Sequence, residues 1–399
     1  MVTNISGKKV LIRVDFNVPL NSQQEITDDT RIIKALPTIN KVLSEGAAVI
    51  LMSHLGRPLK KLNDNGTINK QKYSLRPLVA HLSSLINKPV QFAEDTVGKS
   101  AFDLAIKLEP GQVLLLENTR FNKGEKKGDD ELAAKMAKLA DVFINDAFGA
   151  AHRAHASTTT VAKYFDGGNK SLGLLMEQEI ASARKVLNSP SRPFTAILGG
   201  AKVSDKIQLI EKLLDFTDNI LIGGGMTYTF VKAKHGSIGN SLVEHTHIEL
   251  AKELLEKAKD RNVDFYLPED SLIADNFSND ANFKECSSME IPNGWMGLDI
   301  GPKAIEQYKK VIMASKTVLW NGPLGVFEME NFSKGTFEVA QSVADVTQKG
   351  AFTLIGGGDS VSAINKSGLS QQVSFISTGG GAMLEFLEGK TLPGIAAVS

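Results

Sequence analysis

A repeated alternation between short apolar runs and helical segments is the feature that most constrains this chain. Apolar runs of about five residues end in glycines or polar residues, and a helical pattern follows them. Such alternation is typical of βαβ units, which form parallel sheets with helices on both faces. The pattern therefore predicts a doubly wound α/β fold, and 399 residues are enough for two such domains.

The predicted strands form two groups along the chain. Those of the first group are Lys9–Asp15, Ala47–Met52, Val90–Phe92, Val113–Glu117 and Asp141–Asn145. Those of the second group are Thr195–Leu198, Asn219–Ile222, Asp264–Leu267, Thr317–Leu319, Phe352–Ile355 and Ser374–Ile376. Helices are predicted between them, among others at Ser204–Phe216, His247–Arg261 and Gly335–Thr347.

A boundary is predicted between the two groups of strands. The polar stretch Phe165–Asn169 precedes a predicted helix, Leu172–Leu187, which ends near Pro190. Glycines followed by a proline are typical of boundaries. We therefore predict one domain over residues 1–170 and a second over residues 171–383, which begins with this helix.

Composition excludes several classes of protein. The 45 basic and 45 acidic residues cancel, whereas general nucleic-acid binders carry a basic surplus. The single cysteine, Cys286, excludes a disulfide within the chain, and a buried packing role is favoured over a nucleophile. We find no apolar signal segment at the N-terminus and no apolar run of about 18 residues, so a cytoplasmic protein without a membrane partner is predicted.

Glycines mark the strand ends of the second group. They occur at Gly199-Gly200, Gly223–Gly225, Gly356–Gly358 and Gly379–Gly381. Glycine turns let backbone N–H groups approach phosphates, and the N-terminus of a following helix favours an anion. Glycine also simply permits a tight turn, but four such turns before helices favour phosphate binding.

Charged residues lie among these glycines. Lys202 and Lys206 share one face if a helix starts there, and two cations suit a polyphosphate. Asp359 and Ser360 offer the hard oxygen ligands that Mg²⁺ prefers, although both residue types also cap helices. Glu328, in the loop after Trp320, could hold a ribose or be a solvated loop residue.

Polar and basic residues mark the strand ends of the first group. They are Asp15, Asn17, His54, Arg57, Asn118, Arg120 and Asn145, with Arg31 and Arg153 nearby in the sequence. Ligands of open parallel sheets bind beyond the carboxyl ends of the strands. Arginines bind phosphate and carboxylate in a bidentate manner, so a small substrate with several negative charges is predicted. Metal binding by His152 and His155 is disfavoured, because no carboxylate motif accompanies them.

Several nucleotide-binding motifs are absent. The string Val97–Ser100 resembles the end of a Walker A loop, but Ala93 stands where the earlier glycine is required. Tyr228 and Val361 occupy the third position of a Gly-x-Gly-x-x-Gly pattern at the triple glycines. A nicotinamide-dependent dehydrogenase, the first alternative, is therefore disfavoured. The second alternative, a non-catalytic nucleotide sensor, is also disfavoured. Binding alone does not require the charged residues that this chain retains, among them Arg31, Lys202 and Asp359.

Eight segments in order along the whole chain resemble the phosphoglycerate kinase family. They are Arg13–Pro19, Ser53–Pro58, Leu116–Phe121, Phe148–Ser157, Gly199–Lys206, Trp320–Glu328, Gly356–Ser360 and Ser377–Gly381. Ala150 and Ser360 depart from the residues that are common in that family. The resemblance implies two Rossmann-like domains joined by a hinge helix, with a C-terminal tail of about residues 384–399 returning to the first. It also implies a monomer that transfers a phosphoryl group from 1,3-bisphosphoglycerate to MgADP.

The resemblance also implies a role for individual residues. The glycerate would be held by Asp15, Phe16, Asn17, Arg31, His54, Leu55, Gly56, Arg57, Arg120 and Arg153. The nucleotide would be held by Gly200, Lys202, Lys206, Gly297, Leu298, Asn321, Glu328, Gly357, Gly358, Asp359 and Ser360, with Asp359 as the Mg²⁺ ligand. Catalysis would use Arg31, Lys202 and the N–H groups of Gly357 and Gly379.

The chemistry of this reaction fits these residue types. A carboxylate acceptor with a pKa of about 4 is already ionised at neutral pH, so no general base is required. Catalysis then consists of positioning and of charge stabilisation during an in-line transfer. Because the substrates would be held by different domains, domain closure is expected to align them and to exclude water.

Overall fold

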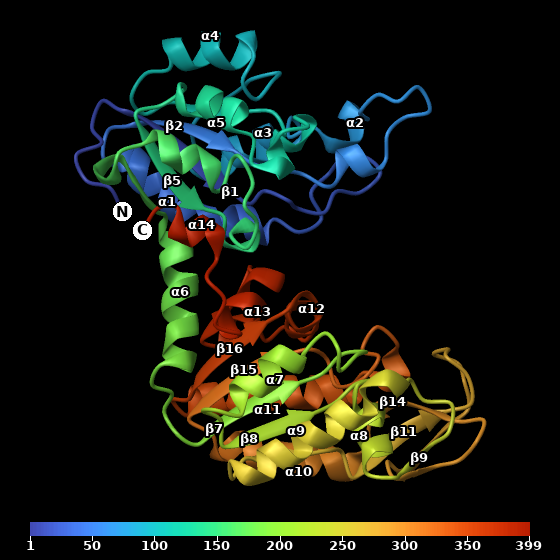
Figure 1. Cartoon of the computed structure of the whole chain (residues 1–399). Coiled ribbons are helices and arrows are strands. Elements are labelled where there is room, and N and C mark those ends of the chain that lie inside the picture. Colours follow the sequence, from blue (N-terminus) through green and yellow to red (C-terminus); the bar gives the residue numbers. More distant parts are fainter. The chain divides into compact units, whose positions relative to one another are not determined.

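The computed structural model describes residues 1–399, which form two compact units (Figure 1). Unit 1 comprises Met1–Ile180 and Lys390–Ser399, and unit 2 comprises Ala181–Gly389. The division falls inside helix α6 (Leu174–Leu187), whereas the predicted boundary precedes this helix. Residues 384–389, which were predicted to belong to the C-terminal tail, group with unit 2.

Unit 1 is built on a six-stranded parallel sheet. Its strand order is β3-β4-β2-β1-β5-β6. The strands are β1 (Lys9–Val14), β2 (Ala48–Met52), β3 (Val90–Phe92), β4 (Val113–Leu115), β5 (Val142–Asp146) and β6 (Lys170–Leu172). Strand β6 was not predicted, since the chain was expected to begin a helix at Leu172.

Helices cover both faces of this sheet because its central strands are apolar on both sides. Val10 and Ile12 of β1 belong to the core beneath α1 (Thr30–Ser44) and α3 (Leu78–Ile86). Leu11 points to the other face and belongs to the core beneath α4 (Lys99–Lys107) and α5 (Asp130–Ala137). This alternation along one strand confirms the predicted doubly wound layering.

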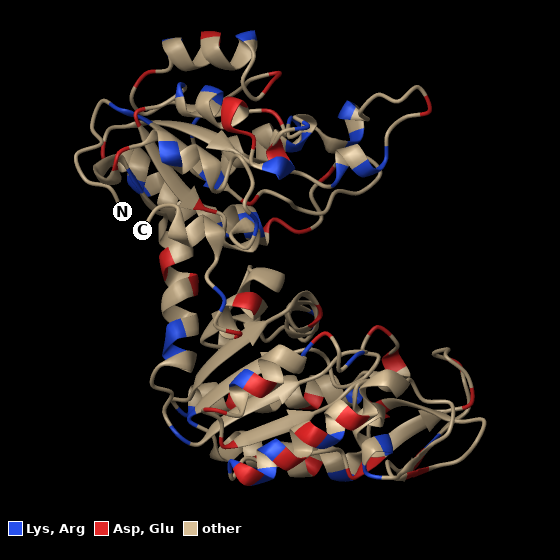
Figure 2. Cartoon of the chain, viewed as in Figure 1, with Lys and Arg blue, Asp and Glu red and all other residues tan.

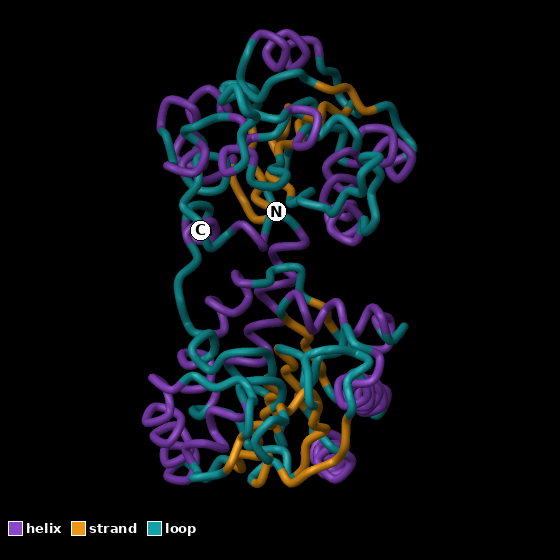
Figure 3. Tube along the Cα trace, turned by 90° about the vertical axis from the view of Figure 1, so that its right-hand side faces the viewer, coloured by secondary structure: helices purple, strands orange, loops and turns teal.

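Unit 2 repeats this plan with a second six-stranded parallel sheet (Figure 3). Its order is β10-β8-β7-β15-β16-β17. The strands are β7 (Phe194–Leu198), β8 (Asn219–Ile222), β10 (Asp264–Tyr266), β15 (Thr317–Asn321), β16 (Phe352–Gly356) and β17 (Phe375–Ile376). Every predicted strand of both units occurs, with ends within two residues of the prediction.

The helices of unit 2 complete its layers. On one face, α10 (Pro302–Ala314) and α11 (Lys334–Gln348) pack into a core around Trp320. The others are α7 (Ile207–Leu213), α8 (Thr227–Ala233), α9 (Ile248–Asp260), α12 (Gly358–Lys366) and α13 (Gly381–Leu387). Basic and acidic residues both occur on α9 and α10 (Figure 2).

A small antiparallel sheet in unit 2 was not predicted. It comprises β11 (Asp270–Ala274), β12 (Phe283–Ser287) and β14 (Met296–Ile300), and a two-stranded pair joins β9 (Ser237–Ile238) to β13 (Glu290–Ile291). Strand β12 is mostly exposed and β14 is only partly buried, while the buried β11 begins with the polar pair Asp270-Ser271, so these strands lack the continuous apolar runs that indicate the parallel sheets. This sheet carries Gly297 and Leu298.

The C-terminal segment is anchored in unit 1. Helix α14 (Pro393–Ala396) packs against the segment that follows β5, where Gly394 N–H donates to the Ala151 carbonyl at 2.8 Å. Asn145 Nδ2 donates to the Gly394 carbonyl at 2.9 Å. A Cβ at Gly394 would lie 3.0 Å from Ala151 Cα, so the close approach favours glycine. None of the helices is long and apolar enough to cross a membrane.

Candidate functional site

The polar residues of unit 1 gather at one edge of its sheet. Asp15 follows β1, His54 follows β2, and Arg120 lies in a 3₁₀ turn (Thr119–Phe121) after β4. Because these strands are parallel and adjacent, their carboxyl ends meet at the same edge. The three residues are only 7%, 5% and 3% exposed, respectively, so their charges are largely removed from water.

Several buried polar atoms at this edge have no partner within the protein. Arg31, in the first turn of α1, contacts Asp15 Oδ2 through its Nη1 atom, while Asp15 Oδ1 is buried and unpaired. Arg120 Nη1 donates to the Gly56 carbonyl at 2.6 Å, but its Nε and Nη2 atoms are buried without an acceptor. Buried donors normally have partners, so the two unpaired nitrogens of Arg120 indicate an anionic ligand.

The electrostatics of this edge favour an anion. The pKa of Arg120 falls to about 10, first because of burial and then because Arg13 and Arg153 lie nearby. Burial, followed by repulsion from Arg120, Lys60, Arg57 and Arg153, also lowers the pKa of Lys126. Cations that destabilise one another in this way would be relieved by a ligand with several negative charges.

The turn after β2 has a backbone conformation that favours glycine. Gly56 has a φ of +60°, and a Cβ there would lie 2.6 Å from the Tyr73 ring. Its N–H donates to Asn17 Oδ1 at 2.8 Å, which joins the β2 and β1 strand ends. Leu55 is buried beside it. Glycine is therefore required at position 56 by both its conformation and its surroundings.

Asn118 ties three segments of this site together. Its Oδ1 accepts hydrogen bonds from Leu55 N–H at 3.2 Å and from Arg120 N–H at 3.0 Å. Its Nδ2 donates to the carbonyls of Leu55 and Tyr73, both at 2.8 Å. Asn118 is fully buried, and all its hydrogen-bonding groups are used internally. It therefore supports the site without reaching a ligand.

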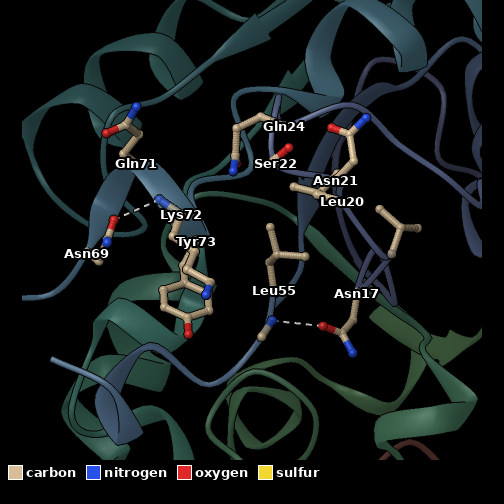
Figure 4. A pocket seen from close by; sticks show the side chains of 12 residues that line it. Asn17, Leu20, Asn21, Ser22, Gln24, Leu55, Asn69, Gln71, Lys72 and Tyr73 are labelled. Carbon is tan, nitrogen blue, oxygen red and sulfur yellow. Dashed lines mark hydrogen bonds between the residues drawn. The ribbon is translucent and has the colours of Figure 1, made fainter.

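A cavity of about 570 Å³ opens beside the Leu55-Gly56 turn (Figure 4). It is lined by Asn17, Val18, Leu20, Asn21, Ser22, Gln24, Leu55, Gly56, Asn69, Gln71, Lys72 and Tyr73. Lys72, in the short helix α2 (Lys70–Tyr73), is its only charged residue. Side-chain amides are thus the largest group among its polar lining residues, and the arginines that would bind an anion are not among its lining residues.

Unit 2 presents the glycine turns that the sequence indicated. Gly200, Gly224, Gly357 and Gly380 have φ values of +109°, +67°, +90° and +51°. Helices α12 and α13 begin directly in the last two glycine runs, at Gly358 and Gly381. These backbone conformations are ones that side chains other than glycine rarely adopt. The turns can therefore bring backbone N–H groups close to a phosphate.

Lys206 and Asn321 form a polar pair beside these turns. Lys206 Nζ donates to Asn321 Oδ1, and Asn321 Nδ2 is buried without a partner. Burial lowers the pKa of Lys206, opposed by Asp205 and Asp359. Helix α7 starts only at Ile207, so the condition under which Lys202 and Lys206 would share a helical face is not met. Lys202 instead lies exposed in the turn before the helix.

The residues after the third and fourth turns have different surroundings. Asp359 is exposed in the first turn of α12, and its carboxylate has no hydrogen bond or ion pair within the protein. Ser360 is fully buried, and its Oγ accepts a hydrogen bond from Gly322 N–H. Gly379 N–H donates to Ser377 Oγ at 3.0 Å. Of these residues, Asp359 is the one that keeps its polar group available.

The surroundings of Asp359 fit a magnesium ion that arrives with a nucleotide. No group of three or more His, Cys, Asp or Glu residues could hold a metal by itself. Mg²⁺ typically binds one or two carboxylates, keeps several waters and takes its other ligands from phosphates. A free carboxylate beside glycine turns and Lys206 fits this mode of binding.

Gly297, on β14, is fixed by buried side chains. A Cβ there would lie 1.7 Å from the Tyr228 hydroxyl, which itself donates to Ser271 Oγ at 3.1 Å. Gly297 N–H donates to Ser241 Oγ at 2.9 Å. The neighbouring Asp299 accepts from Ile300 and Gly335 N–H groups, and burial raises its pKa to about 7. These contacts fix the position of β14, the strand that contains Gly297 and Leu298.

Comparisons with known proteins agree with this arrangement. Residues 2–390 match the family model described as phosphoglycerate kinase. The chain belongs to the phosphoglycerate kinase family. Relatives with this name include those of Porphyromonas gingivalis, at 50% identity over 99% of this chain and 98% of the relative, and of Herpetosiphon aurantiacus, at 52% identity over 99% and 97%.

Solved structures of the family have the same fold. Phosphoglycerate kinase from Coxiella burnetii superposes with a TM-score of 0.86 at 42% identity, covering 99% of this chain and 97% of that one. The enzyme from Pyrococcus horikoshii gives 0.79 at 31% identity, covering 99% and 96%. The predicted family and the predicted α/β fold are both confirmed. The family's activity is that of a glycolytic phosphotransferase with a carboxyl acceptor.

Sequence reasoning about the phosphoglycerate kinase site left out the buried residues behind it. Arg13, Glu125 and Ser157 are all fully buried next to the polar edge of unit 1. A signal was present at Arg13, since a charged residue interrupts an otherwise apolar strand. Phe16 was included, but its side chain is fully buried in the core and its N–H donates to Ser53 Oγ at 2.8 Å, which leaves only its carbonyl for a ligand.

Proposed function

We propose that unit 1 binds the glycerate substrate and that unit 2 binds MgADP or MgATP, so that the chain reversibly transfers a phosphoryl group from 1,3-bisphosphoglycerate to MgADP. The observation that carries the first assignment is the set of buried, unpaired N–H groups on Arg120, beside Asp15 Oδ1. Desolvated guanidinium donors have a high affinity for phosphate and carboxylate oxygens.

The glycerate would be held by residues at the edge of the first sheet. Arg31, Arg57, Arg120 and Arg153 supply positive charge, and His54 and Asn17 supply neutral polar groups. Asp15 Oδ1 lacks a donor and would accept a hydrogen bond from a substrate hydroxyl. The backbone of Phe16, Leu55 and Gly56 would shape the turn around the substrate.

The nucleotide would be held by the glycine turns of the second sheet. Gly200, Gly357 and Gly358 would bring the backbone to the phosphates, with Lys202, Lys206 and the free Nδ2 of Asn321 as donors. Gly297 and Leu298 would lie near the adenine, and the exposed Glu328 near the ribose. Ser360 would act by fixing the Gly322 loop, because its Oγ already accepts the Gly322 N–H.

Transfer itself would need charge stabilisation and no proton acceptor. Bound Mg²⁺ would neutralise charge on the nucleotide phosphates. Arg31 and Lys202 would stabilise the transferring group, helped by the Gly357 N–H. Gly379 N–H would join them only by leaving Ser377 Oγ, to which it donates in this structure.

A coupled assay tests the proposed function directly. Purified protein is given 3-phosphoglycerate and MgATP, and 1,3-bisphosphoglycerate is followed through its dehydrogenase by the loss of NADH absorbance. We expect turnover that requires both substrates and Mg²⁺. Absence of turnover with nucleotide binding intact would contradict the proposal and favour a nucleotide-binding protein without catalysis.

Asp359→Asn tests the proposed metal ligand. An amide keeps the size of the side chain but loses the charge that a hard cation prefers. We expect the Mg²⁺ concentration needed for half-maximal rate to rise roughly tenfold or more, as is typical when the charged member of a close ion contact is neutralised. Asp260→Asn, at an exposed position of α9, is the matched control. An unchanged Mg²⁺ dependence would remove Asp359 from the site.

We also propose that the chain acts as a cytoplasmic monomer. The support is the family's place in glycolysis and the completeness of each proposed site within one copy of the chain. Sedimentation of the purified protein, with and without both substrates, tests the monomeric state.

A further inference from the structure

A chain of buried polar contacts runs behind the glycerate site of unit 1. Ser157 Oγ donates to Glu125 Oε1 at 2.6 Å, and Ser157 N–H donates to Glu125 Oε2 at 3.1 Å. Arg13 Nε donates to Ser157 Oγ at 2.8 Å, and Arg13 Nη2 lies 3.1 Å from His54 Nδ1. Arg13, Glu125 and Ser157 are each 0% exposed.

Arg13 is not placed to bind a substrate directly. Its Nε contacts Ser157, its Nη1 donates to the Val14 carbonyl, and its Nη2 contacts His54. All three nitrogens are therefore used inside the protein, in contrast to Arg120, whose Nε and Nη2 are unpaired. Any effect of Arg13 on the reaction must pass through the residues that it contacts.

The contact with His54 fixes the position of a proton. A guanidinium has only N–H donors and no acceptor. His54 Nδ1 must therefore accept the hydrogen bond from Arg13, and the ring proton of the neutral imidazole must lie on Nε2. The competing acceptor for a proton on Nδ1 is Asp15 Oδ1, but at 3.7 Å it is beyond hydrogen-bond distance.

The charges that face His54 keep its ring neutral. Arg13 from β1, Arg31 from α1, Arg120 from the turn after β4 and Arg153 surround it, with Asp15 as the acidic neighbour. Burial comes first among the causes that hold the pKa of His54 well below its usual value, and the four arginines follow. An imidazolium would also place a proton on Nδ1 against the Arg13 guanidinium.

We propose that Arg13 is a positioning residue that fixes His54 as the neutral tautomer with its proton on Nε2, so that the ring donates from Nε2 to an anionic oxygen of the glycerate substrate. Ser157 and Glu125 hold the Arg13 guanidinium in the required orientation. The placing of glycerate against Nε2 rests on the proposed function, whereas the tautomer itself does not.

Nitrogen NMR on the substrate-free protein tests the tautomer without any assay of activity. Long-range ¹H–¹⁵N spectra of uniformly labelled protein distinguish a protonated from an unprotonated ring nitrogen, and His54→Gln identifies the signals. We expect an unprotonated Nδ1 and a protonated Nε2 from pH 6 to pH 8. A protonated Nδ1, or titration of the ring near pH 6.5 as in an unperturbed histidine, would overturn the proposal.

Ser157→Ala then tests the support of Arg13. This change removes the acceptor of Arg13 Nε while leaving Arg13 and His54 in the chain. We expect part of the His54 population to shift to the Nδ1-protonated tautomer and the KM for 3-phosphoglycerate to rise roughly three- to tenfold, the size expected for one hydrogen bond, with kcat little changed. Arg13→Lys should act in the same direction, because one ammonium group cannot span both Ser157 and His54.

A matched control variant and two contrary outcomes complete this test of Arg13. Arg76 is an arginine of the same unit whose guanidinium lies over the Phe92 ring, and its side chain is far more exposed than that of Arg13. Arg76→Met should change neither the tautomer of His54 nor the KM for 3-phosphoglycerate. A raised KM in Ser157→Ala with an unchanged tautomer would show a merely structural role and would overturn the proposal. The expected tautomer in a wild-type protein that does not turn over would leave the role of Arg13 standing and contradict the proposed function.

Discussion

Lys202→Ala should lower kcat roughly 100- to 1000-fold, the usual effect of removing one donor that stabilises charge in a transition state. Lys202 is exposed in the turn that precedes α7, and its ammonium group has no ion pair within the protein. Its charge is therefore free to act on the nucleotide phosphates. Because the proposed glycerate site lies in unit 1, we expect the KM for 3-phosphoglycerate to change by no more than about twofold, as expected for independent sites.

Steady-state kinetics with 3-phosphoglycerate and MgATP measure both constants. Lys252→Ala, an exposed lysine of α9, is the matched control and should behave as the wild type. Lys202→Arg keeps the charge and should retain more activity than Lys202→Ala. A kcat near the wild-type value in Lys202→Ala would remove Lys202 from the catalytic groups, while leaving the family assignment untouched.

The parallel sheets could be predicted because burial on both faces imposes a simple pattern. Strands such as β2 and β4 are apolar at every position, and such runs are rare outside parallel sheets. The small antiparallel sheet gives no such signal, since β12 is mostly exposed and reads as a polar loop. Helix α7 was predicted too long at both ends, because residues 204–206 before it and 214–216 after it form turns that the sequence pattern does not indicate.

The site could be predicted as far as its residues lie at strand ends. Asp15, His54 and Arg120 meet at one edge because adjacent parallel strands end there. Which polar atoms are free could not be predicted. From the sequence, Asp359 and Ser360 are equally suitable oxygen ligands. In the structure Asp359 is exposed, whereas Ser360 Oγ accepts a hydrogen bond from Gly322 N–H. Such differences depend on contacts between residues that are far apart in the chain.

Glu125→Ala should lower the free energy of unfolding by about 3–5 kcal/mol, the usual cost of removing one partner from a buried charged network. Glu125 is fully buried and accepts two hydrogen bonds from Ser157. Its charge opposes the effect of burial on the Arg13 pKa. Without it, the Arg13 guanidinium remains buried, and Asp15 is the only acidic neighbour that still supports its charge.

Urea unfolding at pH 7, followed by circular dichroism, measures this loss. Glu131→Ala is the matched control: its exposed carboxylate pairs with Lys135 at 2.6 Å, and such surface pairs contribute about 0.5 kcal/mol or less. Glu125→Gln keeps an acceptor for Ser157 and should fall between the two. Equal stabilities for Glu125→Ala and Glu131→Ala would mean that Arg13 does not depend on Glu125. The orientation of Arg13 toward His54 would then have to be maintained by Ser157 and the Val14 carbonyl alone.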